Sequence, residues 1–199
     1  MVLFYLSLLF YYESEHLIYY ISCIGNSKNL SGLPTPKICK DRVKSLLKNF
    51  NNNYMLIDFG CGDGDAIQSF YPYVENTIGI EINETQVISA RKRFINRPSV
   101  SIVHSNIVYY QFMYTPTILY MYEPLWSMKK EEALSIYDSV VTAFQKQTDP
   151  ESVIIYVSGI SPLLDTDFFT KRLYTKKHHS RIPRILGWPG NHVYVFSVN

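Results

Sequence analysis

The sequence begins without basic residues: positions 1–24 contain no Lys or Arg, and the first cation is Lys28. A secretory signal peptide needs a positive region ahead of its apolar stretch, so this absence argues against one. Cysteine is also scarce. Cys23, Cys39 and Cys61 form neither a disulfide framework nor a CxxC metal pair, which favours a reducing compartment and predicts a cytoplasmic protein.

Charge of either sign is sparse as well. The 199 residues include 19 Lys+Arg and 17 Asp+Glu, a formal net charge of +2. This balance excludes a strongly basic nucleic-acid-binding surface or an acidic disordered tail as the dominant feature of the chain. Hydrophobic residues are abundant at 47%, which excludes intrinsic disorder, and the length fits one domain around one core.

The N-terminal residues are mostly apolar over positions 2–12 and 17–24, on either side of Glu-Ser-Glu-His at 13–16. In a membrane-spanning helix the two glutamates would cost about 5–7 kcal/mol, and the apolar residues would return about 3–7 kcal/mol. Because these sums nearly cancel, we expect an apolar helical extension packed on the domain that follows, with a membrane anchor as the alternative. Proline and polar residues at 25–36 predict a linker, so extension and linker cover residues 1–36 and the main domain covers residues 37–199.

The rest of the chain alternates between strands and helices. A helix over residues 37–50 is amphipathic, with apolar residues at i, i+3, i+4 and i+7. Strands are expected at 54–59, 76–82, 100–104, 117–122 and 152–158, separated by helices at 65–73, 84–95 and 127–147. Apolar strands alternating with helices indicate a doubly wound, mostly parallel sheet covered on both faces, an α/β fold. Residues 172–179 and 192–198 flank a turn with Gly and Pro, which predicts a C-terminal antiparallel hairpin and seven strands in all.

The most informative motif follows the strand at 54–59, where Asp58 precedes the loop Gly60-Cys61-Gly62-Asp63-Gly64. Glycine is needed where the backbone takes a positive φ or where a ligand approaches without a Cβ in the way. In a doubly wound sheet this first strand-to-helix turn lies where ligands bind. No Lys-Ser or Lys-Thr pair follows it, so it is not a phosphate-binding P-loop.

An acidic residue, Glu81, ends the next strand, 21 residues after Gly60. A carboxylate at this position accepts hydrogen bonds from both hydroxyls of a ribose. The loop and the acid together predict a ligand that contains a ribose and needs no pyrophosphate. The alternative is that Asp58 only caps its strand and that Glu81 is a surface charge.

On these residues the chain resembles the class I S-adenosylmethionine-dependent methyltransferases, over about residues 37–199 and most specifically over residues 56–126. The resemblance implies a Rossmann-like enzyme with S-adenosylmethionine as its cofactor. It implies that Asp58 organises the methionine end of the cofactor and that Glu81 holds the ribose. The backbone that would wrap the cofactor belongs to Gly60, Cys61, Gly62 and Gly64.

The resemblance also assigns the adenine site. Ile82 would lie against the adenine ring, and Asn106 occupies the position that contacts the adenine amino group. The family usually has Asp there, but the Asn106 amide oxygen is still able to accept that hydrogen bond.

Two rivals accompany this interpretation. A nicotinamide-binding Rossmann oxidoreductase would prefer G-x-G-x-x-G and a turn without acids, whereas Asp63 and Asp65 are expected to repel phosphates. A non-catalytic subunit would keep the fold for cofactor sensing or partner binding.

The acceptor site is expected after the strand at 117–122, where the sequence is Glu123-Pro124-Leu125-Trp126. Members of the family that methylate amino groups of adenine, cytosine or glutamine carry Asp/Asn-Pro-Pro-Tyr there. The resemblance implies that Glu123, next to Pro124, positions an acceptor amine and that Trp126 stacks on a flat or cationic group. We therefore expect N-methylation of a protein or small molecule rather than of a nucleic acid. In the alternative, Glu123 caps the next helix and Trp126 belongs to the core.

A basic stretch near the C-terminus contains no acid; its members are Lys171, Arg172, Lys176, Lys177, His178, His179, Arg181 and Arg184. We expect a solvated strand face, with a phosphate backbone or an acidic protein segment as alternative partners. Neighbours in a strand point to opposite faces, so His178 and His179 are not expected to share a metal ion, and no metal site is expected.

Pro34-Thr35-Pro36 and the helix after it resemble the segment that precedes the domain in some protein-lysine methyltransferases of this class, certain of which carry an apolar N-terminal segment. Residues 2–24 lie just upstream. We expect them to form a lid over the cofactor or acceptor, with a tether to a membrane-associated substrate as the alternative. The sequence specifies neither the acceptor nor the oligomeric state.

Overall fold

The computed structural model describes residues 35–50, 53–122, 124–125, 128–158, 164, 166–172, 174–181 and 192–198. The chain divides into two compact units, Met1–Leu33 and Pro34–Asn199, and the description below concerns the second. The expected lid or tether at residues 2–24 therefore lies outside the described residues and stays a prediction. Within the described part, no helix is long and apolar enough to cross a membrane.

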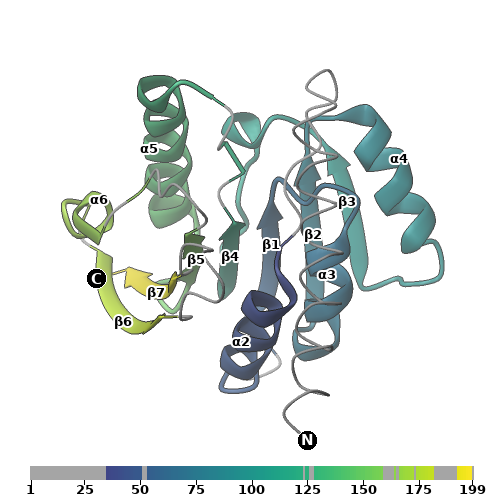
Figure 1. The fold of residues 1–199 in the computed structure, drawn as a ribbon, viewed down its shortest axis with the longest axis horizontal. Coiled ribbons are helices and arrows are strands. Elements are labelled where there is room, and N and C mark those ends of the chain that lie inside the picture. Colours follow the sequence, from purple (N-terminus) through teal and green to yellow (C-terminus); the bar gives the residue numbers. More distant parts are fainter. Residues whose placement is uncertain are drawn as a thin grey trace, which may run out of the picture. The chain divides into compact units, whose positions relative to one another are not determined.

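A seven-stranded sheet forms the centre of this unit (Figure 1). Its order is β3-β2-β1-β4-β5-β7-β6; the first five strands run parallel, and β7 is antiparallel to both of its neighbours. The strands are β1 Met55–Phe59, β2 Asn76–Glu81, β3 Val100–His104, β4 Thr117–Tyr122, β5 Val153–Ser158, β6 Tyr174–Arg181 and β7 His192–Val198. The predicted α/β sheet with a C-terminal antiparallel hairpin is confirmed.

Helices cover both faces of the sheet. Those described are α2 Lys37–Leu47, α3 Asp65–Phe70, α4 Glu84–Arg93, α5 Lys130–Gln147 and α6 Thr166–Thr170, with 3-10 turns η1 Tyr71–Tyr73 and η2 Ile107–Tyr109. Helices α2 and α3 lie side by side, and α4 lies at the β3 end of the sheet (Figure 1). Helix α4 begins at Glu84 because the Asn83 side chain accepts a hydrogen bond from the Gln86 amide and so caps its first turn.

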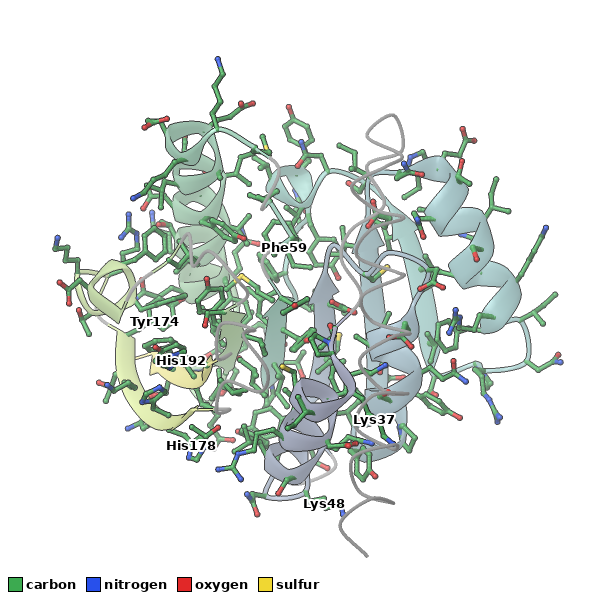
Figure 2. All side chains as sticks on the ribbon, viewed as in Figure 1. Lys37, Lys48, Phe59, Tyr174, His178 and His192 are labelled. Atoms are coloured by element: carbon green, nitrogen blue, oxygen red, sulfur yellow. The ribbon has the colours of Figure 1, made fainter. Side chains whose placement is uncertain are left out.

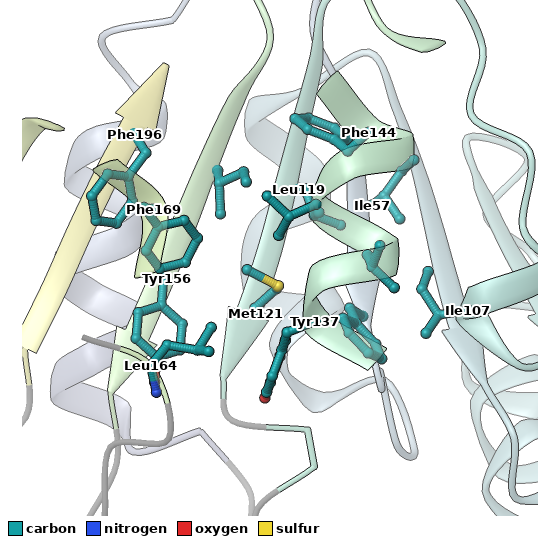
Figure 3. Packing of buried hydrophobic residues seen from close by; sticks show 14 of the residues in the cluster. Ile57, Ile107, Leu119, Met121, Tyr137, Phe144, Tyr156, Leu164, Phe169 and Phe196 are labelled. Carbon is teal, nitrogen blue, oxygen red and sulfur yellow. The ribbon is translucent and has the colours of Figure 1, made fainter. Parts of the chain in front are cut away.

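The alternation of side chains along each strand divides the core into layers. In β1, Leu56 packs in a cluster with α2 and α3, whereas Ile57 packs in a cluster with α5 and α6. Figure 3 shows the second cluster, in which Phe169 of α6 stacks on Phe196 of β7 with ring centroids 4.1 Å apart. Apolar residues on both faces of β1 are what a central strand of a two-sided sheet requires.

Several element ends differ from the sequence-based expectation. The long helix α5 begins at Lys130 rather than 127, and β6 begins at Tyr174 rather than 172. The second difference follows from α6, a five-residue helix that was not predicted. The Arg172 guanidinium donates to the Phe168 carbonyl and pairs with Asp138, so residue 172 lies in the turn after α6 and not in the strand.

Candidate functional site

The loop between β1 and α3 carries three glycines in the left-handed region. The φ angles are +75° at Gly60, +56° at Gly62 and +86° at Gly64. A side chain costs energy at such angles, so the alternating glycines follow from the backbone path. A Cβ added to Gly60 would lie 2.6 Å from the Pro124 Cβ, whereas one added to Gly62 would meet nothing within 4 Å. Gly60 is thus covered by the chain just after β4, and Gly62 lies on the open side of the loop.

Four backbone amides of this loop donate hydrogen bonds within the protein. The Gly60 and Cys61 amides both donate to the Ile80 carbonyl, at 2.9 and 3.1 Å. The Gly62 amide donates to the Glu81 carboxylate at 3.0 Å, and the Gly64 amide donates to the Cys61 carbonyl at 2.9 Å. A loop that binds pyrophosphate directs such amides at the ligand instead. The geometry therefore favours a ligand that does not need a cradle of amides for phosphate.

The two aspartates of the loop region are each paired with a cation. Asp63 pairs with Arg93 of α4, and Asp65 pairs with Lys40 of α2 at 2.6 Å. The expectation that these acids repel phosphates is therefore weakened, because the partners offset their charges. A dinucleotide is disfavoured instead because the loop amides already donate hydrogen bonds within the protein.

Asp58 is buried at the base of the loop. Only 3% of its surface is exposed, and its Oδ2 has no hydrogen-bond partner among the described residues. Burial, with the negative charges of Glu81 and Asp65, raises the pKa of this carboxyl to about 8. A buried polar atom without a partner is unfavourable, and a cationic group would satisfy it. The ammonium at the methionine end of S-adenosylmethionine has that chemistry, so Asp58 fits the expected cofactor.

Glu81 lies where β2 ends and holds the loop to α4. Its Oε2 accepts from the Gly62 amide at 3.0 Å, and its Oε1 accepts from the Asn83 amide at 2.8 Å. Because each carboxylate oxygen has further lone pairs, this fixed carboxylate is still able to accept from hydroxyl groups of a ligand. It is a positioned acceptor and not a freely solvated charge.

The residues expected around an adenine differ in their surroundings. Ile82 is 65% exposed next to Glu81, so this apolar side chain is open to solvent just after β2 ends. Asn106 accepts from the Val108 amide at 3.1 Å and so begins the turn η2. That bond uses one lone pair of the amide oxygen and leaves the other for an adenine amino group.

The Cys61 thiol is directed into the protein, apart from a weak hydrogen bond of 3.6 Å that it donates to the Gly62 carbonyl. Its side chain is 6% exposed and points to β2, where a Cβ added to Gly79 would lie 2.7 Å from the Cys61 Sγ. Burial is the largest cause that raises the pKa of the thiol well above its ordinary value. The thiol is therefore a packing group, and Gly79 is the position that gives it room.

Of the predicted acceptor residues, Glu123 and Trp126 lie outside the described residues, and their roles stay predictions. Pro124 is described, and it lies against Gly60 of the glycine loop. The chain after β4 therefore comes directly to the loop expected to bind the cofactor.

The residues of the basic stretch do not share one surface, and the two histidines contact different partners. His178 contacts Arg42 of α2 at 3.4 Å, and burial, Arg42 and His179 lower the pKa of its ring. His179 points to the opposite face, where its Nε2 lies 2.8 Å from the His192 Nδ1. Figure 2 shows His178 and His192 at the hairpin end of the molecule, away from Phe59 at the end of β1.

Over the described ranges, no group of three His, Cys, Asp or Glu side chains is placed to hold a metal ion. Arg184 lies outside these ranges.

Sequence reasoning missed the partners that hold the site together. Thr35 and Tyr120 share a buried hydrogen bond of 3.0 Å, although 85 positions separate them. Lys40 and Arg93 bring cations to the loop from α2 and α4. The helical spacing places Lys40 and Arg93 on their helices, but no local pattern indicates which acid each one meets.

The fold, a seven-stranded sheet with β7 inserted antiparallel between β5 and β6, is similar to the folds of solved methyltransferase structures. The chain is similar to the N-methyltransferase NodS from Bradyrhizobium japonicum WM9 in complex with S-adenosyl-L-homocysteine, at 13% identity over 90% of this chain and 97% of that one, with a TM-score of 0.67. It is also similar to a putative RNA methyltransferase from Pyrococcus horikoshii, at 15% identity over 82% of this chain and 86% of that one, with a TM-score of 0.64.

A third similar structure is the magnesium protoporphyrin IX methyltransferase ChlM from Synechocystis PCC 6803 with bound SAM. It is 13% identical over 80% of this chain and 78% of that one, with a TM-score of 0.61. No protein-family model and no curated protein sequence matches the chain. At these identities the likeness defines the fold of the protein as that of the class I methyltransferases.

Proposed function

We propose that the protein is an S-adenosylmethionine-dependent methyltransferase that methylates a nitrogen atom of a protein or small-molecule acceptor. The observation that carries the proposal is the buried Asp58, whose Oδ2 lacks a partner among the described residues, at the base of a loop in which all three glycine amides bond within the protein. This arrangement suits a ligand with a cationic end and no phosphate. Solved structures of the same fold with bound SAM or S-adenosyl-L-homocysteine support the same cofactor.

Each of three described residues would bind a different part of the cofactor. Asp58 would bind the ammonium of the methionine end, Glu81 would accept hydrogen bonds from the ribose hydroxyls, and Ile82 would cover the adenine. The bound cofactor supplies an electrophilic methyl group on a sulfonium. Methyl transfer depends on alignment more than on acid–base chemistry, so the role proposed for Glu123 is to orient the acceptor amine. The contact of Pro124 with Gly60 supports an acceptor site beside the loop.

Isothermal titration calorimetry tests the cofactor. Micromolar binding of S-adenosylhomocysteine and no binding of NAD is the expected result, and the reverse would overturn the proposed cofactor and favour the oxidoreductase. A Glu81→Ala variant should bind S-adenosylhomocysteine at least tenfold more weakly, because it loses an acceptor to both the ligand and the Gly62 amide. Glu84→Ala is the matched control, since it removes an exposed carboxylate three residues away on α4. Equal affinity in the two variants would overturn the ribose assignment.

The acceptor is tested with tritiated S-adenosylmethionine and separate pools of protein, RNA, DNA and metabolites. Label in the protein or metabolite pool is the expected result. Label in RNA or DNA alone would overturn the proposed acceptor class. Cofactor binding without product from any pool would favour a non-catalytic subunit.

A further inference from the structure

The segment formed by Thr35 and the first turn of α2 is attached to the candidate site at two points. Thr35, immediately before Pro36, shares a hydrogen bond of 3.0 Å with the Tyr120 hydroxyl. Lys40, one turn later, forms a 2.6 Å ion pair with Asp65, the first residue of α3. Thr35 is 7% exposed and Tyr120 is 1% exposed, so the first contact is removed from solvent.

The Thr35–Tyr120 contact lies beside Asp58. Tyr120 is the register partner of Asp58 in the neighbouring strand, and adjacent strands lie about 4.8 Å apart. Both side chains point to the face covered by α2 and α3, where the Tyr120 ring packs edge-on against Phe70 with centroids 5.0 Å apart. Burial, and then the negative charge of Asp58, raise the pKa of the Tyr120 phenol, so it stays protonated beside the carboxyl. The Tyr120 side chain thus links the Thr35 hydroxyl to the strand position beside Asp58.

We propose that Thr35, acting through Tyr120, is a positioning residue that fixes the start of α2 to the strand next to Asp58, so that the cationic end of the cofactor enters a preformed site. The inference rests on the proposed function, because it takes S-adenosylmethionine as the ligand. Thr35 itself need not touch the cofactor. Its hydroxyl fixes residues 35–37 before the ligand arrives, and Lys40 fixes the next turn.

The consequence is a specific loss of affinity when the hydroxyl is removed. Without the bond, the segment before α2 has to become ordered when the ligand binds. The free-energy cost of this ordering opposes binding and lowers the affinity. We expect Thr35→Val and Tyr120→Phe each to weaken S-adenosylhomocysteine binding about tenfold. Thr35→Ser keeps the hydroxyl and should bind as the unaltered protein does. The double variant should bind no more weakly than either single one, because both remove the same bond.

A second buried threonine provides the control. Thr148 is 4% exposed, and its hydroxyl donates to the Phe144 carbonyl at 2.7 Å, at the end of α5. Thr148→Val should lower the melting temperature but leave the affinity for S-adenosylhomocysteine unchanged.

Calorimetric titration and melting temperature, measured on the same samples, separate the outcomes. If Thr35→Val melts lower but binds with the affinity of the unaltered protein, the contact is structural only and the inference is overturned. If Thr35→Val does not fold, Tyr120→Phe, which keeps the ring packed, decides the question in the same way. If the unaltered protein does not bind S-adenosylhomocysteine, the proposed function fails first, and this outcome is distinct from equal binding by all variants.

Discussion

Gly60 and Pro124 lie so close together that no side chain fits between them. A Cβ on Gly60 would come within 2.6 Å of the Pro124 Cβ. The first residue belongs to the loop after β1, and the second belongs to the chain just after β4. Because β1 and β4 are neighbours in the sheet, this contact joins the loop expected to bind the cofactor to the segment expected to present the acceptor.

Gly60→Ala and Gly62→Ala form a matched pair that tests this contact. Both glycines have positive φ, so each alanine costs about 1–2 kcal/mol in backbone strain. Gly60→Ala alone also overpacks Pro124, which should add about 1–3 kcal/mol. Urea unfolding should therefore give a lower free energy of unfolding for Gly60→Ala.

A Pro124→Gly background provides the control, because it removes the Cβ that the new alanine meets. In that background the difference between the two alanine variants should become small. If Gly60→Ala remains the less stable variant by the same amount, the overpacking explanation is wrong.

The strands of the fold were predictable from sequence for a physical reason. β1, β4 and β5 are buried on both faces, so nearly every residue is apolar, and turn residues bound each run. The short α6 and η2 were not predictable, because five and three residues carry too little periodicity to distinguish a helix from a loop.

The candidate site was predictable in part. The alternating glycines and Glu81 follow a local spacing, so their place in the fold could be inferred from sequence. The bonds of Thr35 to Tyr120, Lys40 to Asp65 and Arg93 to Asp63 span 85, 25 and 30 positions. Such pairs depend on how the helices pack on the sheet, and one sequence without relatives contains no pattern for them.

Ile82 should affect ligand affinity without affecting stability. It is 65% exposed, so Ile82→Ser removes little buried apolar surface and should leave the melting temperature nearly unchanged. If the side chain covers an adenine, the same variant should bind S-adenosylhomocysteine several-fold more weakly. Titration calorimetry provides the measurement.

Ile95→Ser is the control, because Ile95 is a 79% exposed isoleucine that lies beyond the end of α4. It should change neither quantity. Equal affinities for the two serine variants would argue against an adenine site at Ile82.

The raised pKa of Asp58 makes the stability of the ligand-free protein depend on pH. The unfolded chain ionises this carboxyl near pH 4, whereas the folded protein keeps the proton up to about pH 8. Below pH 4 the group is neutral in both states and contributes no difference. Between these values the folded state binds more protons than the unfolded state, so the free energy of unfolding falls as pH rises. Above pH 8 the loss is complete and constant.

Asp58→Asn should remove this dependence, because asparagine has a similar shape and no proton to lose. We expect the variant and the parent to have similar free energies of unfolding at about pH 4, and the variant to be the more stable by a growing margin up to about pH 8. Urea unfolding at intervals across this pH range measures the difference in free energy of unfolding between variant and parent. The titration of all other groups is common to both proteins and cancels in this difference. A margin that shrinks with rising pH would mean that the folded protein holds Asp58 ionised. In that case Oδ2 would already have a partner, and the argument for a cationic ligand at this carboxyl would fail.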